Sequence, residues 1–248
     1  MSDSTSGTPS SSRRADYGLD APRMVKLFAL LAGVLLSAGA ALVRLRGAGS
    51  AGLASAFAWM GGSFAWTALL MIASSRWGKL RARDALLDRL ALRGDETVLD
   101  VGCGHGLMLL GAARRLPRGR AVGIDLWSQK DQAANRAQAT LDNAALEGVA
   151  DRVEVRDGDM RRLPFDDASM DAVVSSLAIH NVPTAADRAV AISEIVRVLR
   201  PGGRVGILDI AHVGEYAREL RKHGCVVERL ALVPTIFPPT RSLVARKS

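Results

Sequence analysis

Residues 98–106 read VLDVGCGHG, and this stretch decides the fold. An apolar run ends at Asp100, glycines occupy every second position from residue 102 to residue 106, and an apolar run with helical spacing begins at Leu107. This order predicts a buried strand, a tight turn and a helix. Glycines allow positive φ angles and a close approach of the backbone to a ligand. By itself, such a turn would serve any nucleotide-type cofactor.

A second acid follows at a position that suits a ribose. Residues 122–125 read VGID, a short apolar run that ends in Asp125, 25 residues after Asp100. A carboxylate at the tip of a second strand offers two oxygen acceptors to a ribose diol. The two strands therefore favour a ligand that contains a nucleoside.

From Thr97 onward, strand and helix patterns alternate. We expect strands near residues 97–101, 121–125, 152–156, 171–176, 204–210, 226–233 and 242–247, and helices near residues 106–116, 129–147, 185–199 and 214–223. Thr184 and Asp187 have the spacing of a helix cap, and three glycines follow expected helix ends, namely Gly148, Gly202 and Gly224. The alternation predicts an α/β fold with a seven-stranded, mostly parallel sheet and helices on both faces.

Three further motifs carry a family resemblance. Residues 157–160 read DGDM, residues 163–176 read LPFDDASMDAVVSS and residues 199–205 read LRPGGRV. With the glycine turn and Asp125, they resemble the class I S-adenosylmethionine-dependent methyltransferases, in the methyltransferase type 11 branch of small-molecule, quinone-type and sterol-type C-methyltransferases. The resemblance covers roughly residues 84–248. It implies a Rossmann-like sheet that ends in a reversed β-hairpin, and S-adenosylmethionine as cofactor.

The resemblance also implies which residues bind the cofactor. Asp100 would orient the methionine part, and Asp125 would accept hydrogen bonds from both ribose hydroxyls. Asp159 would accept a hydrogen bond from the adenine amine, and Met160 would donate its backbone N–H to a ring nitrogen. The remaining expected contacts come from the glycine turn and from the ends of the next strands: Gly102, Cys103, Gly104, Leu126, Trp127, Gly158 and Ser176.

Alternatives stay open at several of these positions. The Asp100 carboxylate would also serve to cap the turn, Trp127 would also pack on the following helix, and Asp157 competes with Asp159 for the adenine. At the exit of the fourth expected strand, His180 and Asn181 are the candidate catalytic residues. Methyl transfer depends on alignment more than on acid catalysis. His180 is therefore either a base for an acidic nucleophile or a histidine held at a strand end.

Charge distribution argues against nucleic acid as a partner. The chain carries a net charge of +8, but residues 95–248 hold 21 basic and 20 acidic side chains, so the excess lies in front of the expected catalytic domain. The motifs with which nucleic-acid methyltransferases grip a base are absent at the fourth strand. Two cysteines, Cys103 and Cys225, form no disulfide framework, and the scattered histidines predict no metal site.

The N-terminal third predicts a membrane anchor. Residues 1–22 are rich in Ser, Thr, Gly and Pro and are expected to be a disordered tail. Uncharged runs over residues 27–43 and 51–75 predict a transmembrane helical hairpin within residues 23–75. A signal peptide and a hydrophobic cap or dimerisation module are the alternatives. Residues 76–94 form a basic, amphipathic linker helix, and residues 95–248 form the methyltransferase domain.

Basic residues flank both ends of the expected hairpin, which places both ends and the catalytic domain on the cytoplasmic side of the cell membrane. Glycines in the two spans are compatible with close helix contact in a homo-oligomer: Gly33, Gly39, Gly61 and Gly62.

Together these features predict a membrane-tethered methyltransferase that acts on a hydrophobic or lipid-like small-molecule acceptor. A methyltransferase for a soluble small molecule or a protein is the second hypothesis, and a non-catalytic cofactor-binding subunit of a membrane complex is the third. The connection after the fifth strand, residues 210–214, is short for a quinone-type relative. We therefore expect the front segment of the chain to help exclude water from the active site.

Overall fold

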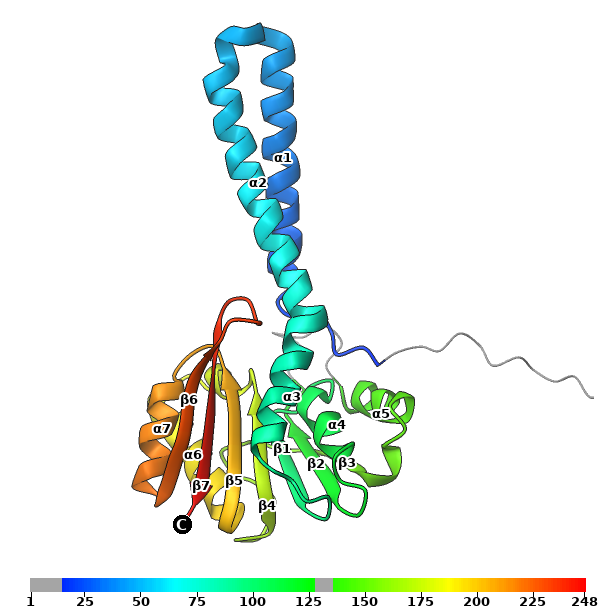
Figure 1. Cartoon of the computed structure of the whole chain (residues 1–248), viewed down its shortest axis with the longest axis vertical. Coiled ribbons are helices and arrows are strands. Elements are labelled where there is room, and N and C mark those ends of the chain that lie inside the picture. The colour runs from blue at the N-terminus through cyan, green and yellow to red at the C-terminus, as the bar shows by residue number, and fades with distance from the viewer. Residues whose placement is uncertain (1–14, 128–135) are drawn as a thin grey trace, which may run out of the picture.

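The computed structural model describes residues 15–127 and 136–248 of the chain. A long helical hairpin projects from one edge of an α/β domain (Figure 1). The hairpin consists of α1 (Pro22–Arg46) and α2 (Ala51–Ala73), joined by the 3-10 turn η1 (Gly47–Ser50).

The two hairpin helices pack through small residues. Gly39 lies against the backbone of Ala54, and Gly61 lies against Leu36, so neither position has room for a larger side chain. Gly33 and Gly62 have open space beside them. In the most apolar 18-residue segment of each helix, only 17% is buried inside the protein. Large apolar side chains such as Leu45 and Trp59 are 84% and 80% exposed. By length and composition, both helices are able to cross a membrane.

The second hairpin helix runs on into the domain. A π-helical turn, η2 (Ser74–Gly78), connects α2 to α3 (Lys79–Arg89). Lys79 and Arg83 belong to the expected basic, amphipathic linker helix, and the structure buries both, at 3% and 4% exposed. Both side chains have protein partners, which makes this part of the linker a structural support of the domain.

The sheet has seven strands in the order β3-β2-β1-β4-β5-β7-β6, and β7 is antiparallel to both of its neighbours. The other neighbouring strands pair in parallel. The strands are β1 (Thr97–Val101), β2 (Arg120–Asp125), β3 (Val153–Asp157), β4 (Met170–Ser176), β5 (Leu199–Asp209), β6 (Cys225–Val233) and β7 (Thr240–Lys247). This architecture confirms the expected α/β fold with its reversed terminal hairpin.

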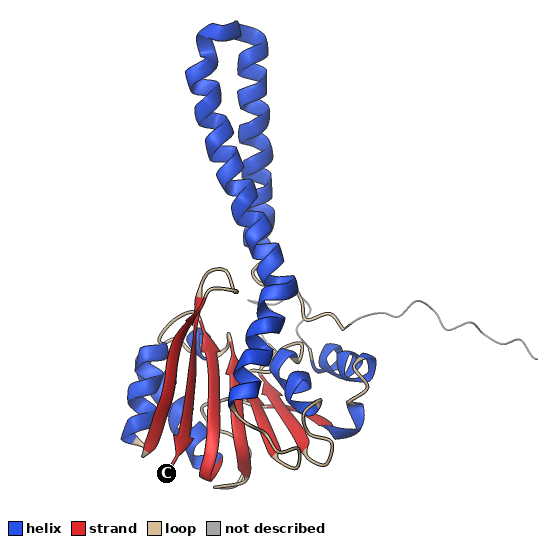
Figure 2. Cartoon of the chain, in the orientation of Figure 1, coloured by secondary structure: helices blue, strands red, loops and turns tan. Residues whose placement is uncertain are grey.

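Helices cover both faces of the sheet (Figure 2). Apolar side chains of α3, α4 (Leu107–Ala113) and α5 (Ala137–Leu146) build one core layer, and those of α6 (Ala185–Val198) and α7 (Val213–Lys222) build the other. Two 3-10 turns complete the described elements, η3 (Ala150–Arg152) and η4 (Ile179–Asn181). The expected helix over residues 129–147 is seen from Ala137 to Leu146, while residues 128–135 lie outside the described part.

The local signals for helix ends are confirmed at Thr184, Gly148 and Gly224, but the one at Gly202 is wrong. The Thr184 hydroxyl accepts a hydrogen bond from the Asp187 N–H at 3.0 Å and donates to the Asp187 carboxylate at 2.8 Å. Gly148, Gly202 and Gly224 have φ angles of 68°, 77° and 79°. The start of β5 differs from expectation, because the strand begins at Leu199 and Gly202 lies inside it, where the pairing with β4 shifts register.

Residues 15–21 differ from the disordered tail expected over residues 1–22, whereas residues 1–14 lie outside the described part. The Asp16 N–H donates to the Asn143 side chain at 2.9 Å, and the buried Tyr17 hydroxyl donates to Glu147 at 2.9 Å. Lys79 donates to the carbonyls of Tyr17 and Gly18 at 2.9 and 2.6 Å. This segment, called the strap below, joins α3 to α5 across the glycine turn.

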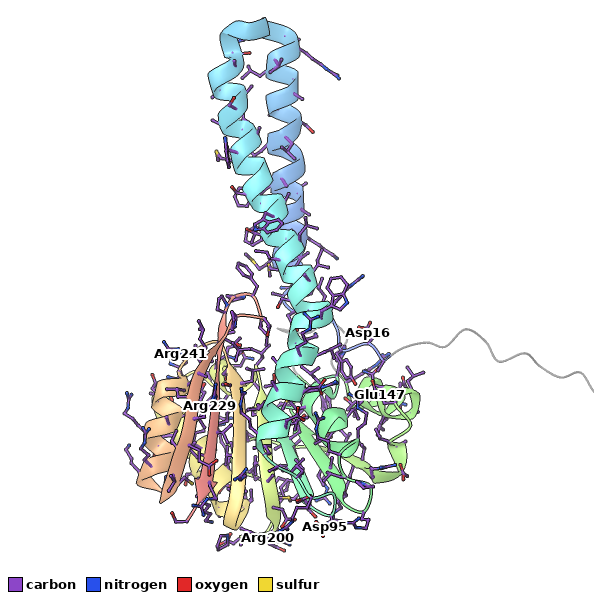
Figure 3. The ribbon with its side chains drawn as sticks, viewed as in Figure 1. Asp16, Asp95, Glu147, Arg200, Arg229 and Arg241 are labelled. Carbon is purple, nitrogen blue, oxygen red and sulfur yellow. The ribbon has the colours of Figure 1, made fainter. Side chains whose placement is uncertain are left out.

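The base of the hairpin lies at the edge of the sheet where the parallel strands end. The β6–β7 loop leaves β6 at this edge, and its Phe237 N–H donates to the Ser74 hydroxyl at 2.8 Å. In the antiparallel pairing of β7 with β5, Arg241 lies opposite Asp209 at the end of β5. Figure 3 shows Arg241 and Asp16 on the hairpin side of the domain, with Asp95 and Arg200 at the opposite edge.

Candidate active site

The glycine turn after β1 is held against β2 by backbone hydrogen bonds. The N–H groups of Gly102 and Cys103 donate to the Ile124 carbonyl at 2.9 and 3.0 Å. Gly102 and Gly104 have φ angles of 75° and 49°, which favour glycine. A Cβ atom on Gly102 would overlap the side chain of Ala178. Gly102 therefore packs against Ala178, and the Cys103 thiol packs beside Gly123 and Leu109.

Asp125 ends β2 and organises the loops on either side of it. Its carboxylate accepts from the Gly104 N–H at 2.9 Å and from the Trp127 N–H at 2.7 Å. The Gly158 N–H donates to the Asp125 carbonyl at 3.1 Å, which brings the loop after β3 beside the tip of β2. One residue therefore ties together the glycine turn, Trp127 and Gly158.

Asp100 is a buried acid beneath the glycine turn. It is 1% exposed, and one carboxylate oxygen accepts from the Leu109 N–H at the start of α4 at 2.8 Å. The other oxygen has no hydrogen-bond partner among the described residues. Burial raises the pKa of Asp100 to about 8; the Leu109 N–H opposes this shift, and the charge of Asp125 adds to it. The hydrogen bond from the Leu109 N–H supports the interpretation that Asp100 caps the turn. The same hydrogen bond fixes the orientation of the carboxylate and therefore of its unpartnered oxygen.

Trp127 and Leu126 follow Asp125 with different exposure. Leu126 is 64% exposed. Trp127 has a positive φ of 56°, and its indole N–H donates to the Asp157 carboxylate. Asp157, the competitor for the adenine, is thus engaged by Trp127. The alternative, that Trp127 packs on a helix beginning after Ser128, involves residues outside the described part.

Asp159 and Met160 lie in the loop after β3. The Asp159 carboxylate accepts from the Arg161 guanidinium at 2.6 Å and from the Arg161 N–H at 2.9 Å. The Arg161 side chain lowers the pKa of Asp159. The Met160 side chain packs against the core and reaches toward Gly102. A ligand amine at Asp159 would therefore share the carboxylate with Arg161.

His180 is paired with an acid that the sequence analysis did not single out. His180 lies in η4 after β4, and its Nδ1 is 2.6 Å from Oδ1 of Asp209 without the alignment of a hydrogen bond. The His180 backbone N–H donates to the same carboxylate at 3.1 Å. Asp209 is 1% exposed and also accepts from the Tyr216 hydroxyl at 3.3 Å.

The remaining candidates at this strand end differ in their surroundings. Ser176 has a buried hydroxyl with no hydrogen-bond partner among the described residues, and the Asn181 residue is exposed. The sequence did contain a signal for Asp209, since it is an acid near the end of the fifth expected strand. In the sheet, β5 lies next to β4 with Ser176 opposite Leu208, which brings Asp209 beside the strand-four exit. The topology therefore brings the ends of β1, β2, β4 and β5 to one edge, with acids at three of them.

Comparisons with known proteins indicate the kind of domain that carries this edge. Residues 99–207 match the family described as methyltransferase domain. The chain is 36% identical over 132 residues to a ubiquinone/menaquinone biosynthesis C-methyltransferase of Dinoroseobacter shibae, a match that covers 53% of this chain and 49% of that protein. It is also 36% identical over 129 residues to the 27-O-demethylrifamycin SV methyltransferase of Amycolatopsis mediterranei, with 52% and 44% covered. The chain thus spans about half the length of these curated relatives.

Solved structures share the fold. The geranyl diphosphate C-methyltransferase of Streptomyces coelicolor, solved with S-adenosyl-L-homocysteine, aligns with a TM-score of 0.57 and 19% identity over 68% of this chain and 78% of that one. On this evidence, residues 99–207 are similar to the methyltransferase domain family, and the α/β domain has the Rossmann-like fold of S-adenosylmethionine-dependent methyltransferases.

Proposed function

We propose that the chain is a membrane-tethered methyltransferase that transfers a methyl group from S-adenosylmethionine to a hydrophobic or lipid-like small molecule. One observation carries this proposal: the ends of β1, β2, β4 and β5, with their candidate site residues, lie on the side of the domain from which the apolar hairpin projects (Figure 1). If the hairpin spans the membrane with both ends in the cytoplasm, this edge faces the bilayer surface, where a hydrophobic acceptor is concentrated.

The residues at this edge fit the cofactor. Gly102 and Gly104 adopt the positive φ angles of the tight turn, and the buried Asp100 has an oxygen without a hydrogen-bond partner among the described residues. Asp125 would accept from the ribose hydroxyls, while Asp159 and Met160 would hold the adenine, flanked by Leu126 and Trp127. S-adenosylmethionine supplies an electrophilic methyl group when it is bound.

We assign the strand-four exit to the acceptor. His180 would remove a proton from an acidic acceptor, and the buried Asp209 would hold the imidazole in place and stabilise its protonated form. Asp209 is thus proposed as a positioning residue. Ser176 and the exposed Asn181 line the same exit and would contact the acceptor. The strap and the β6–β7 loop would help exclude water.

The test is transfer of labelled methyl from S-adenosylmethionine to fractionated host extract by the full chain. We expect label in the lipid fraction, lost in Asp125→Ala, because the ribose would lose an acceptor carboxylate. His180→Gln should retain cofactor binding and lower kcat by about 100-fold or more if the histidine acts as a base. Asp209→Asn should give a smaller loss and a changed pH profile.

Other outcomes identify the other hypotheses. Label found only in proteins or aqueous metabolites would contradict the lipid acceptor and favour a soluble substrate. Cofactor binding without transfer to any fraction would favour a non-catalytic, cofactor-binding subunit. Unchanged kcat in His180→Gln would show that the transfer proceeds by alignment alone.

A further inference from the structure

A cavity separate from the strand-end site opens where the hairpin meets the domain. Its volume is about 810 Å³, and its walls come from the strap, the end of α2, the η2 turn, α3, and the ends of α4 and α5. Three of its lining residues are basic, namely Arg76, Arg83 and Arg114. The lining also includes the acids Asp16 and Glu147.

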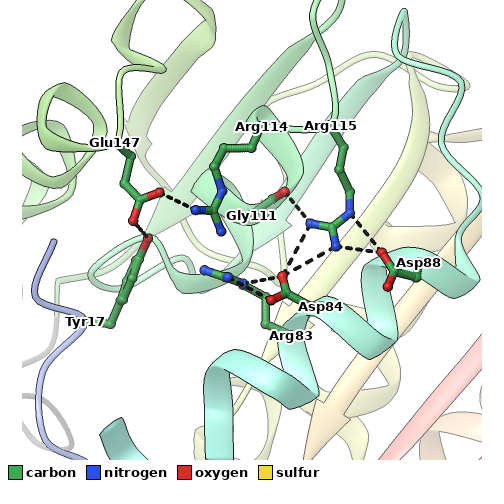
Figure 4. A network of polar contacts seen from close by, with 8 residues as sticks. All are labelled: Tyr17, Arg83, Asp84, Asp88, Gly111, Arg114, Arg115 and Glu147. Carbon is green, nitrogen blue, oxygen red and sulfur yellow. Dashed lines mark hydrogen bonds and ion pairs between the residues drawn. The ribbon is translucent and has the colours of Figure 1, made fainter. Parts of the chain in front are cut away.

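The acids of this cavity already have partners within the described chain. Glu147 accepts from Arg114 at 2.6 Å and from Tyr17 at 2.9 Å, and Asp16 accepts from the Gly18 N–H at 2.9 Å (Figure 4 shows the first two contacts). Arg76 is exposed at the rim and has no ion-pair partner within residues 15–127 and 136–248. The Arg76 guanidinium is therefore free to bind an anion in this cavity.

Arg83 provides the second observation that points to a ligand. Its side chain is only 5% exposed, and its Nε and Nη2 donate to Asp84 at 2.9 and 3.1 Å (Figure 4). Its Nη1 is buried and has no hydrogen-bond partner among the described residues. The guanidinium lies over the Tyr17 ring, 5.9 Å from its centre. A buried cationic N–H group without an acceptor is costly, and an anionic oxygen would satisfy it.

The rest of the wall is apolar and continues toward the hairpin. Leu19, Ile72, Leu80 and Leu146 line the cavity. Ile72 belongs to the last turn of α2, so the cavity opens where the proposed membrane-spanning segment ends. Guanidinium groups match phosphate oxygens in geometry, and basic pockets beside transmembrane helices bind anionic headgroups. An apolar wall next to them suits an acyl chain.

We propose that this cavity binds one anionic phospholipid, with its phosphate at Arg76, Arg83 and Arg114 and its acyl chain along the apolar wall. This proposal rests on the membrane tether of the proposed function. The strap forms one wall of the cavity and also touches the glycine turn, since the Asp16 carbonyl is 3.3 Å from His105 Nδ1. Asn143 bridges the same two segments through the carbonyls of Asp16 and His105, at 2.8 and 3.0 Å. A bound lipid would therefore stabilise the strap over the cofactor turn.

The experiment uses the full chain reconstituted in nanodiscs of phosphatidylcholine with or without phosphatidylglycerol. Native mass spectrometry then measures the lipid retained on the released protein. We expect one phosphatidylglycerol per chain, with retention at least tenfold lower in the double variant Arg76→Gln/Arg114→Gln. Arg81→Gln is the matched control, because Arg81 is an exposed arginine of α3 outside the cavity lining.

A fold-preserving second variant is Arg76→Gln alone, since Arg76 is exposed and makes no ion pair in the described chain. It should also lower retention, by a smaller factor. Equal retention of both lipids, or an equal loss in Arg81→Gln, would overturn the site. Full displacement of the lipid by soluble glycerol phosphate would show that the cavity binds a free phosphate group and does not recognise the lipid as a whole.

Failure of the lipid site and failure of the tether give different results. Flotation with vesicles tests the tether, and a chain that does not float overturns the tether itself. A chain that floats but retains no phosphatidylglycerol overturns only the lipid site. Cofactor binding is measured separately: lipid should raise the affinity for S-adenosylmethionine in wild type and in Arg81→Gln, but not in the double variant.

Discussion

At the scale of single residues, two acids at neighbouring strand ends behave differently because their surroundings differ. Asp125 accepts two backbone N–H groups, whereas Asp100 is fully buried and accepts one. Burial therefore dominates at Asp100 and raises its pKa to about 8. A buried carboxyl of this kind costs stability in the free protein.

The Asp100→Asn variant tests this cost. Between about pH 4, the ordinary pKa of an aspartate, and pH 8, the folded carboxyl is protonated while the unfolded one is ionised, so wild-type stability falls as pH rises through this window. Asparagine does not titrate. We expect the Tm of the cofactor-free variant to exceed that of wild type by an amount that grows from pH 5 to pH 8, at roughly 2–4 °C for each kcal/mol.

Thermal unfolding of the full chain in detergent measures this difference, and isothermal titration measures the affinity for the cofactor. The variant should bind S-adenosylmethionine more weakly although it is more stable. Parallel Tm curves for the two proteins across this pH range would show that the buried carboxyl is not the source of the pH dependence.

At the scale of elements, the decisive contact is the one between the hairpin base and the β6–β7 loop. Ser74 accepts the Phe237 N–H, and Gly78 packs directly on the Thr235 carbonyl. Lys79 then continues the same helix and holds the strap through two carbonyls. One short stretch of helix thus fixes the hairpin, the loop and the strap relative to one another.

Gly78→Ala tests this docking. Its Cβ would overlap the Thr235 carbonyl oxygen, so we expect a loss of about 1–3 kcal/mol in stability, the usual cost of overpacking. Gly62→Ala in α2 is the matched control, because nothing lies within 4 Å of its Cβ position and alanine favours helix. Thermal unfolding should show a lower Tm for the first variant and an unchanged or higher Tm for the second. The reverse order would contradict the close docking.

At the scale of the whole molecule, the hairpin and the α/β domain share one continuous helix, from Ala51 to Arg89. The strap, which leads into α1, lies against the glycine turn through Asp16 and His105. The proposed tether would therefore both locate the enzyme and shape its active-site edge.

A chain that begins at Lys79 tests the second of these roles. It keeps the sheet and both helix layers but lacks the strap and the hairpin. We expect a folded domain by circular dichroism, with weaker cofactor binding and little transfer to a membrane-embedded acceptor. Full activity of this truncated chain on the native acceptor would show that the front segment is not a lid. A full-length chain with Arg81→Gln, assayed in parallel, controls for the altered charge near the junction.

The sequence by itself determined the order of the seven strands along the chain, the glycine turn and the helix cap at Thr184, because these depend on local backbone geometry and periodicity. It also carried the resemblance to S-adenosylmethionine-dependent methyltransferases, from which the candidate cofactor residues follow. The apolar length of the two spans came from composition alone. Each of these properties resides in neighbouring residues or in a fixed spacing.

Only the tertiary structure decided what depends on distant partners. It paired His180 with Asp209 across adjacent strand ends, buried Lys79 and Arg83 of the basic linker helix, and placed residues 15–21 against the domain. The cavity at the hairpin base is likewise made from six separate segments. Local patterns do not report burial or charge pairing of this kind, because the partner residues are up to 130 positions apart in the chain.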